Sequence, residues 1–249
     1  MTSGAGGRPT TTPVLRALVF DFDGLILETE EPLYLAWREV YEAHGVELEL
    51  EDWARSIGGS DVYDPLEELE RRCGARVDRD AVQAARRARR DELLHRLAPC
   101  AGVASYLDHA ARAGLRLAVA SSSETPWVDG HLRRLGLRHH FRALACFDDV
   151  GVTKPAPDAY LLALERLGVT PAEAVAFEDS HHGLMAAQAA GLRCVVVPTA
   201  MTRHLDFAAA DLVVDRLDQE PLATLVERLG FALPGPAPDR GEWGAGTGG

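Results

Sequence analysis

Five short, continuously apolar segments recur along this chain and are joined by stretches of helical or loop-like sequence. The segments are ALVF before Asp21, LRLAVA before Ser121, AVAF before Glu178, CVVVP at 194–198 and DLVVD at 211–215. Strands that are apolar at every position, rather than at alternate positions, are typical of a parallel sheet covered by helices on both faces. We therefore expect an α/β fold with a Rossmann-like, doubly wound parallel sheet.

One long part of the chain lacks such segments. Between Thr29 and Pro99 the sequence is rich in Glu, Arg, Ala and Leu, and Leu33, Trp37 and Val40 follow one another at helical spacing. An all-helical stretch directly after the first strand predicts a cap domain inserted into the sheet domain. The expected organisation is a disordered tail over 1–13, an α/β core formed by 14–29 and 99–233, a helical cap over 30–98 and a second disordered tail over 234–249.

The charge and hydropathy of the chain exclude several classes of protein. With 26 basic and 38 acidic side chains the formal net charge is −12, whereas a general nucleic-acid binder needs a basic surface. No apolar run approaches the roughly 20 residues that span a bilayer, and the N-terminus lacks the pattern of a signal peptide. We expect a cytoplasmic protein with neither nucleic acid nor membrane as a partner. The chain shows no obvious apolar stripe, which favours a monomer and leaves a dimer open.

Reactive side chains follow the ends of the expected strands. They are Asp21 and Asp23 after the first strand, Ser121 after the second, Lys154 in a turn-rich stretch, and Glu178 and Asp179 after the third. The carboxyl ends of parallel strands meet at one edge of the sheet, so these side chains can converge. Alone, the D-x-D-G pattern could be a simple capping loop, but carboxylates with an amine and a hydroxyl suit joint binding of magnesium and phosphate.

Four stretches of the sequence together resemble a known family. DFDGLILETE, VASSS around Ser121, TKPAPDAY around Lys154 and FEDSHHGLMAAQAAG look like the four ordered motifs of the haloacid dehalogenase-like (HAD) hydrolases. The resemblance runs from about Leu15 to Val214. It includes a helical cap of the kind found in the beta-phosphoglucomutase-like subgroup.

The resemblance implies a role for each of these residues. Asp21 would be the nucleophile that forms an aspartyl-phosphate, and Asp23 the general acid and base. Ser121 and Lys154 would bind the phosphoryl group. Mg²⁺ would be the cofactor, with Asp21, the backbone carbonyl of Asp23, and Asp179 as ligands and Glu178 close by.

The family contains several activities, and Asp23, Leu33 and the cap loop help to choose among them. Asp23 favours phosphate esters, because the family's dehalogenases lack an aspartate two residues after the nucleophile. The implied function is a magnesium-dependent phosphatase that hydrolyses a small phosphomonoester, such as a sugar phosphate. A sugar phosphomutase is the alternative, but beta-phosphoglucomutases carry a histidine at the place of Leu33 and an arginine in the cap loop, here Ile57-Gly58-Gly59-Ser60-Asp61. A phospho-ligand-binding module without turnover is a further alternative.

Further residues are expected near the substrate or in the packing. Thr29, Ser122, Gly59 and Ser60 are predicted to bind the substrate, and Thr125 to lie at the edge of its pocket. The run Arg86, Arg87, Arg89 and Arg90 favours a solvated helix face over a substrate-attracting surface. Tyr34, Trp37, Trp53 and Tyr63 are predicted to pack inside the cap. His181 and His182 are predicted at a helix entry, since magnesium prefers oxygen ligands.

Overall fold

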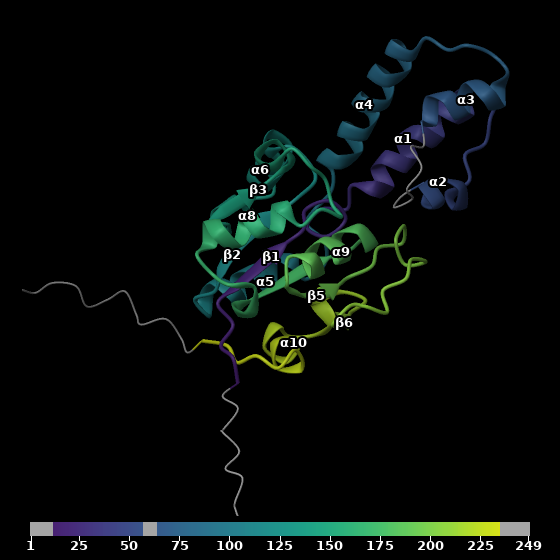
Figure 1. Cartoon of the computed structure of the whole chain (residues 1–249). Helices are drawn as coiled ribbons and strands as arrows, with labels where there is room; N and C mark the ends of the chain where they lie inside the picture. The colour runs from purple at the N-terminus through teal and green to yellow at the C-terminus, as the bar shows by residue number, and fades with distance from the viewer. Residues whose placement is uncertain (1–11, 57–63, 235–249) are drawn as a thin grey trace, which may run out of the picture.

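The computed structural model describes residues 12–56 and 64–234 and contains one parallel sheet (Figure 1). Its six strands lie in the order β3-β2-β1-β4-β5-β6. They are β1 (Ala17–Phe20), β2 (Arg116–Ala120), β3 (Ala143–Ala145), β4 (Ala174–Glu178), β5 (Arg193–Val196) and β6 (Leu212–Val213). This arrangement confirms the predicted α/β class with a doubly wound parallel sheet.

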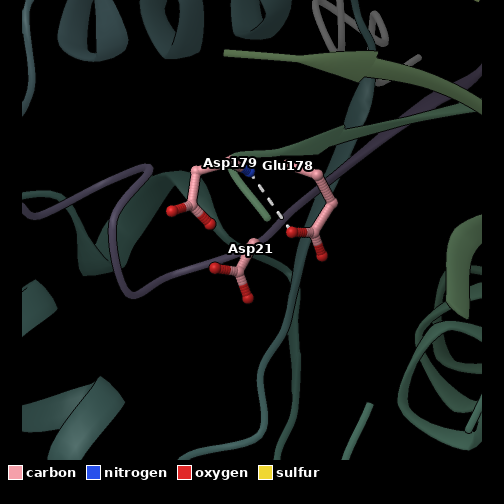
Figure 2. A group of neighbouring side chains, drawn as sticks. All are labelled: Asp21, Glu178 and Asp179. Carbon is pink, nitrogen blue, oxygen red and sulfur yellow. Dashed lines mark hydrogen bonds between the residues drawn. The ribbon is translucent and has the colours of Figure 1, made fainter. Parts of the chain in front are cut away.

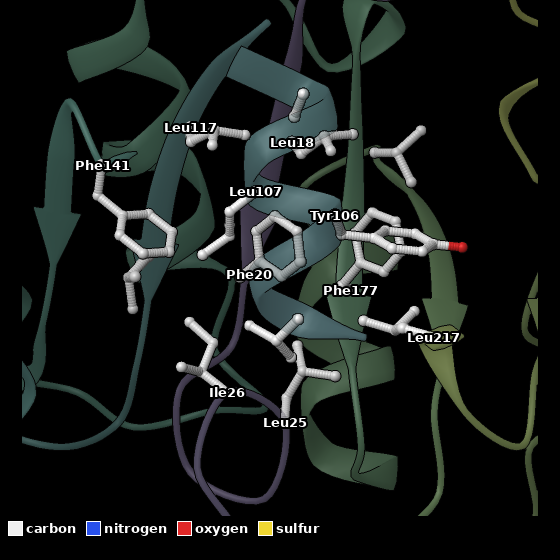
Figure 3. Packing of buried hydrophobic residues seen from close by; sticks show 14 of the residues in the cluster. Leu18, Phe20, Leu25, Ile26, Tyr106, Leu107, Leu117, Phe141, Phe177 and Leu217 are labelled. Carbon is white, nitrogen blue, oxygen red and sulfur yellow. The ribbon is translucent and has the colours of Figure 1, made fainter. Parts of the chain in front are cut away.

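Helices cover both faces of the sheet. They are α5 (Val103–Arg112), α6 (Thr125–Arg134), α7 (Phe147–Val150), α8 (Asp158–Leu167), α9 (His181–Ala189) and α10 (Leu222–Arg228), with short 3-10 turns at Arg138–His140, Pro171–Glu173 and Leu217–Gln219. Leu18 and Phe20 of β1 belong to one cluster with residues of α5, α6 and α10, and Figure 3 shows them beside Tyr106 and Leu107 of α5. Ala17 and Val19 pack with α8 and α9. The continuous apolarity of β1 therefore follows from its burial on both sides.

The centre of the sheet brings three strand ends to the same level. Phe20 at the end of β1 is paired with Val119 of β2 and with Phe177 of β4. The rings of Phe20 and Phe177 stack with their centroids 4.8 Å apart, as Figure 3 shows. The residues that follow these positions consequently emerge side by side at the carboxyl edge of the sheet.

The predicted helical region stands apart from the sheet in Figure 1. Its helices are α1 (Glu30–Ala43), α2 (Leu50–Ser56), α3 (Pro65–Cys73) and α4 (Arg79–His95). They enclose a separate hydrophobic cluster in which Tyr34, Trp37 and Trp53 are buried, as predicted. Tyr63 lies outside the described residues. Met201, from the segment between β5 and β6, is also buried in this cluster.

Two sequence-based expectations differ from the structure. The strand β3 was not predicted, because a strand of three residues with the sequence ALA gives no extended apolar run. Arg86 was expected on a solvated face, but it is buried, and its guanidinium lies 5.3 Å from the centroid of the Trp37 ring. A long side chain can cover an aromatic ring in this way and still reach water with its charged end.

Among the described residues, no helix is long and apolar enough to cross a membrane. The four cysteines are free, with Cys146 and Cys194 buried.

Candidate active site

A cavity of about 270 Å³ opens at the carboxyl edge of the sheet. It is lined by residues that follow β1, β2, β4 and β5 and by the loop before α8: Asp21, Asp23, Glu30, Ser121, Ser122, Thr153, Lys154, Asp179, Ser180, His181, His182, Thr202 and Leu205. The parallel register of the strands thus brings together residues that are more than 150 positions apart in the sequence, including most of the predicted site.

Lys154 is the buried cation of the site. Its Nζ donates a short hydrogen bond to Oδ1 of Asp21 and lies 2.5 Å from Oε1 of Glu178. Burial alone lowers the pKa of Lys154, but the two carboxylates outweigh burial and raise it. Lys154 is therefore charged at neutral pH and can hold a second anion near Asp21.

Glu178 is fully buried and is held by several donors. The hydroxyl of Tyr160 on α8 donates to Oε1 of Glu178 over 2.5 Å, and the backbone N–H of Asp179 donates to Oε2 over 3.3 Å. Burial followed by the nearby Glu178 charge raises the pKa of Tyr160 well above its usual value, so its hydroxyl stays protonated as a donor. Glu178 thus positions Lys154 through the contact between Oε1 and Nζ.

Three carboxylates form a compact acidic cluster. One oxygen from each of Asp21, Glu178 and Asp179 lies within 4.8 Å of the other two, and Figure 2 shows the carboxyl groups turned toward a shared space. Burial raises the pKa of Asp21 to about 8, with Glu178 and Asp23 adding to the rise and Lys154 opposing it. Burial and the neighbouring Asp21 and Glu178 also raise the pKa of Asp179. A divalent cation would offset this repulsion, and an all-oxygen donor set fits magnesium.

Asp23 stands outside the acidic cluster, and both of its carboxyl oxygens accept hydrogen bonds. Ser123 Oγ donates to Oδ2 over 2.6 Å, and Nε1 of Trp127 donates to Oδ1 over 3.0 Å. Asp23 still lines the cavity. Two carboxylates only two residues apart therefore have different surroundings: Asp21 faces Lys154, and Asp23 faces neutral donors.

The other predicted site residues lie at different distances from the cavity. Ser121 and Ser122 line it, and Ser122 Oγ accepts from the backbone N–H of Lys154 over 3.1 Å. Thr29 is buried at the start of α1 and is not among the described residues lining the cavity, where Glu30 is found instead. Gly59 and Ser60 lie outside the described residues.

Two further predictions concern the neighbourhood of the site. The prediction that Thr125 lies at the edge of the substrate pocket is wrong. Its hydroxyl donates a hydrogen bond to Oδ1 of Asp148 over 2.9 Å, and Thr125 lines a different depression of the surface. His181 begins α9, as predicted, and its Nδ1 lies 2.9 Å from the carbonyl oxygen of Asp206.

The sequence reasoning missed Glu30, Ser123, Trp127 and Tyr160. Tyr160 lies six residues after Lys154, within the same TKPAPDAY stretch, and one helical turn brings it back toward the strand end. Trp127 follows Ser121 by six residues in the same way. Attention to the first turn of each helix after a strand-end loop would have identified both. Burial raises the pKa of Glu30 to about 7, and the charges of Asp23 and Glu28 contribute.

The chain matches the family model described as haloacid dehalogenase-like hydrolase over residues 18–197, and it belongs to this family. The match spans the strand-end loops and the helical region. The resemblance predicted from the four motifs is therefore confirmed.

Two named proteins and one solved structure are similar to this chain over most of its length. YhcW of Bacillus subtilis (strain 168) is 40% identical over 216 residues, which cover 87% of this chain and 98% of YhcW. The fructose-1-phosphate phosphatase YqaB of Escherichia coli (strain K12) is 35% identical, covering 72% of this chain and 95% of YqaB. Among solved structures, a variant of CbbY from Rhodobacter sphaeroides in complex with xylulose-(1,5)bisphosphate is 34% identical, with a TM-score of 0.68 and coverage of 83% of this chain and 96% of that one.

Proposed function

We propose that this protein is a magnesium-dependent phosphatase that hydrolyses small phosphomonoesters through an aspartyl-phosphate on Asp21. The observation that carries the proposal is the pairing of Asp21 with the buried Lys154, while Asp23, two residues away, faces the same cavity with different hydrogen-bond partners. Nucleophilic and acid–base work require two carboxylates in different environments.

In the first step, an Asp21 oxygen attacks the phosphorus atom and the bond from phosphorus to the leaving oxygen breaks. Asp23 donates its proton to that oxygen, so the dephosphorylated product leaves as a neutral alcohol while the phosphoryl group stays on Asp21. Lys154 and Ser121, which line the cavity, hold the phosphoryl oxygens as charge develops on them.

In the second step, a water molecule attacks the phosphorus atom of phosphorylated Asp21. Asp23 takes a proton from this water, which returns Asp23 to its protonated form, and the bond between phosphorus and the Asp21 oxygen breaks. Inorganic phosphate is released and Asp21 is a free carboxylate again. Glu178 keeps Lys154 in place in both steps through the contact between Oε1 and Nζ.

Asp21, Asp179 and the backbone carbonyl of Asp23 are the proposed magnesium ligands, with Glu178 close by. When bound, the cation supplies positive charge to the phosphoryl oxygens. Burial, and after it the neighbouring carboxylates, raise the pKa values of Asp21 and Asp179, and a bound cation would favour their ionised forms, which supports this assignment.

A phosphorylated carbohydrate is the proposed class of substrate. The names of YqaB and of the CbbY complex include phosphorylated sugars, and a cavity of about 270 Å³ accommodates a small metabolite. Thr29, Ser122, Gly59 and Ser60 stay proposed substrate contacts. We also propose that the protein acts as a monomer in the cytoplasm and that it binds neither nucleic acid nor a membrane.

The test is phosphate release from a panel of sugar phosphates, with and without Mg²⁺. Asp21→Asn should reduce turnover by at least about 10³-fold, because the amide is not a nucleophile. The matched control is Asp80→Asn, an exposed carboxylate in the first turn of α4, which should retain full activity. Isomerisation dependent on a sugar bisphosphate would support a phosphomutase, and tight binding without turnover would support a binding module.

A further inference from the structure

We propose that Trp127 is a positioning residue that orients the carboxyl group of Asp23. This inference rests on the proposed function, because it assigns Asp23 the role of general acid and base. The structure links Trp127 on one side to Asp23 in the core and on the other side to Arg90 of helix α4.

The two groups that contact the carboxyl of Asp23 differ in their hydrogen-bond chemistry. The indole Nε1 of Trp127 can only donate, so Oδ1 of Asp23 must act as an acceptor toward it. The hydroxyl of Ser123 can donate or accept, and it contacts Oδ2. Oδ2 is consequently the oxygen that can carry a proton without breaking either contact. Trp127 thereby assigns the transferable proton to Oδ2.

The indole of Trp127 is itself held by contacts with neighbouring rings. The ring of His131, one turn further along α6, meets Trp127 edge-on with the centroids 4.4 Å apart. His131 also contacts the ring of Phe22, which lies between the two catalytic aspartates, with centroids 6.2 Å apart. His131 therefore links Trp127 to the segment whose side chain it orients, and this packing restricts the rotation of the indole.

Trp127 also contacts the cap, through Arg90 of α4. The guanidinium of Arg90 lies 4.8 Å from the centroid of the Trp127 ring, and Asp91 accepts from Nε and Nη2 of Arg90 over 2.9 and 2.7 Å. An arginine over an indole is attracted to the ring face. The indole is thus held between core and cap, with its N–H directed at Asp23.

Trp127→Phe is the informative change, because it removes the N–H donor and keeps a ring for Arg90 and His131. Loss of orientation should matter most where the leaving oxygen needs a proton. For a hexose phosphate, we expect kcat/KM to fall by about 10-fold, a part of the 10²–10⁴ that general acid catalysis contributes. For p-nitrophenyl phosphate, whose leaving group departs without a proton, kcat/KM should change by less than about 2-fold. This parameter excludes hydrolysis of the phospho-enzyme, so the comparison isolates the first step.

Trp37→Phe is the matched control, because Trp37 also lies beneath an arginine, Arg86, at 5.3 Å but does not contact Asp23. It should leave the ratio between the two substrates unchanged. In an Asp23→Asn background, Trp127→Phe should cause no further loss of kcat/KM. If Trp127→Phe lowered kcat/KM equally for both substrates, the inference would be overturned. It would also be overturned if Trp127→Phe lowered kcat/KM as much in the Asp23→Asn protein as in the wild type. Wild-type protein that releases no phosphate from either substrate would instead overturn the proposed function, and this inference with it.

A second measurement does not depend on activity or on the folding of Trp127→Phe. The indole N–H signals of the four tryptophans can be recorded by NMR in the wild type and in Asp23→Ala. One indole proton should move upfield when its acceptor is removed. Four unchanged signals would contradict the hydrogen bond on which the proposal depends.

Discussion

Gly183 lies where any side chain would meet a buried carboxylate. A Cβ at this position would lie 1.9 Å from Oε2 of Glu178. Gly183→Ala should therefore displace Glu178, lower the free energy of unfolding by about 1–3 kcal/mol and weaken phosphate release through Lys154. Chemical denaturation and a kinetic assay would measure the two effects.

Gly130 provides the matched control for this change. It also lies inside a helix, α6, and a Cβ there would meet nothing within 4 Å. Gly130→Ala should raise the free energy of unfolding by about 0.5–1 kcal/mol, because alanine is the better helix former. A similar effect of both substitutions would show that helix propensity, and not contact with Glu178, is responsible.

The raised pKa of Asp21 predicts how pH and magnesium act together. Between about pH 4 and its folded-state pKa of about 8, the folded protein binds more protons at this group than the unfolded chain does. Stability of the metal-free protein should therefore fall as the pH rises through this window. Magnesium binds the ionised carboxylates, so its stabilising effect should grow with pH.

Calorimetry with Mg²⁺ or with a chelator, at several pH values in this window, would check this expectation. The gain in Tm on adding Mg²⁺ should increase from acidic to alkaline pH in the wild type. In Asp21→Asn the increase should be smaller, because one of the two proposed ligands with a raised pKa has been removed and only Asp179 is left. A gain in Tm that is constant across the window would contradict the assignment of Asp21 as a ligand.

At the level of elements, the segment between β5 and β6 connects the two parts of the molecule. Met201 is buried in the hydrophobic cluster of the helical region, while Thr202 and Leu205 line the catalytic cavity. Thr199 holds the segment in a turn, since its Oγ1 accepts from the backbone N–H of Met201 over 3.1 Å. One segment of the core therefore supports the cap and shapes the substrate pocket.

Met201→Ala should lower the free energy of unfolding by about 2–4 kcal/mol, because it leaves a cavity among aromatic side chains. It should also raise KM, since Thr202 follows directly. Met185→Ala is the control, because Met185 lies on α9 with 45% of its surface exposed, and it should change stability by less than about 0.5 kcal/mol. Equal effects of the two substitutions would remove the proposed link between this segment and the cap.

The sequence predicted the elements whose signals are local. Continuous apolar runs identified β1, β2, β4, β5 and β6, and the residues that follow these runs identified most of the cavity wall. It did not predict β3, whose three small residues become a strand only by pairing with β2. Met201 was missed for a similar reason, because its burial in the cluster of the helical region depends on a contact that no spacing along the chain reveals. Trp127 does carry a local signal, its place in the first turn of the helix after the Ser121 loop.

At the level of the whole molecule, the connection between core and cap favours a hinge. The two connecting segments lie side by side, because the backbone N–H of Cys100 donates to the carbonyl of Ile26 over 2.9 Å. Arg134 of α6 donates to the carbonyl of Leu97 over 3.0 Å. The two chain connections between the sheet and the helical region thus form a narrow neck near Thr29 and 98–101, beside the contacts made by Met201 and by Arg90 with Trp127. Rotation about this neck leaves both hydrophobic clusters intact provided that the segment carrying Met201 moves with the helical region.

We therefore expect the cap, over residues 30–98, to close when the site holds Mg²⁺ and a phosphate analogue such as tetrafluoroaluminate. Closure would exclude water while Asp21 is being phosphorylated. Small-angle X-ray scattering should show a smaller radius of gyration with both ligands than with either alone, and crystals of the two states should differ in cap angle. Because Met201 is buried in the cap, the segment between β5 and β6 should move with it and bring Thr202 and Leu205 onto the substrate. An unchanged radius and identical cap angles would show instead that the cap is a fixed wall of the pocket.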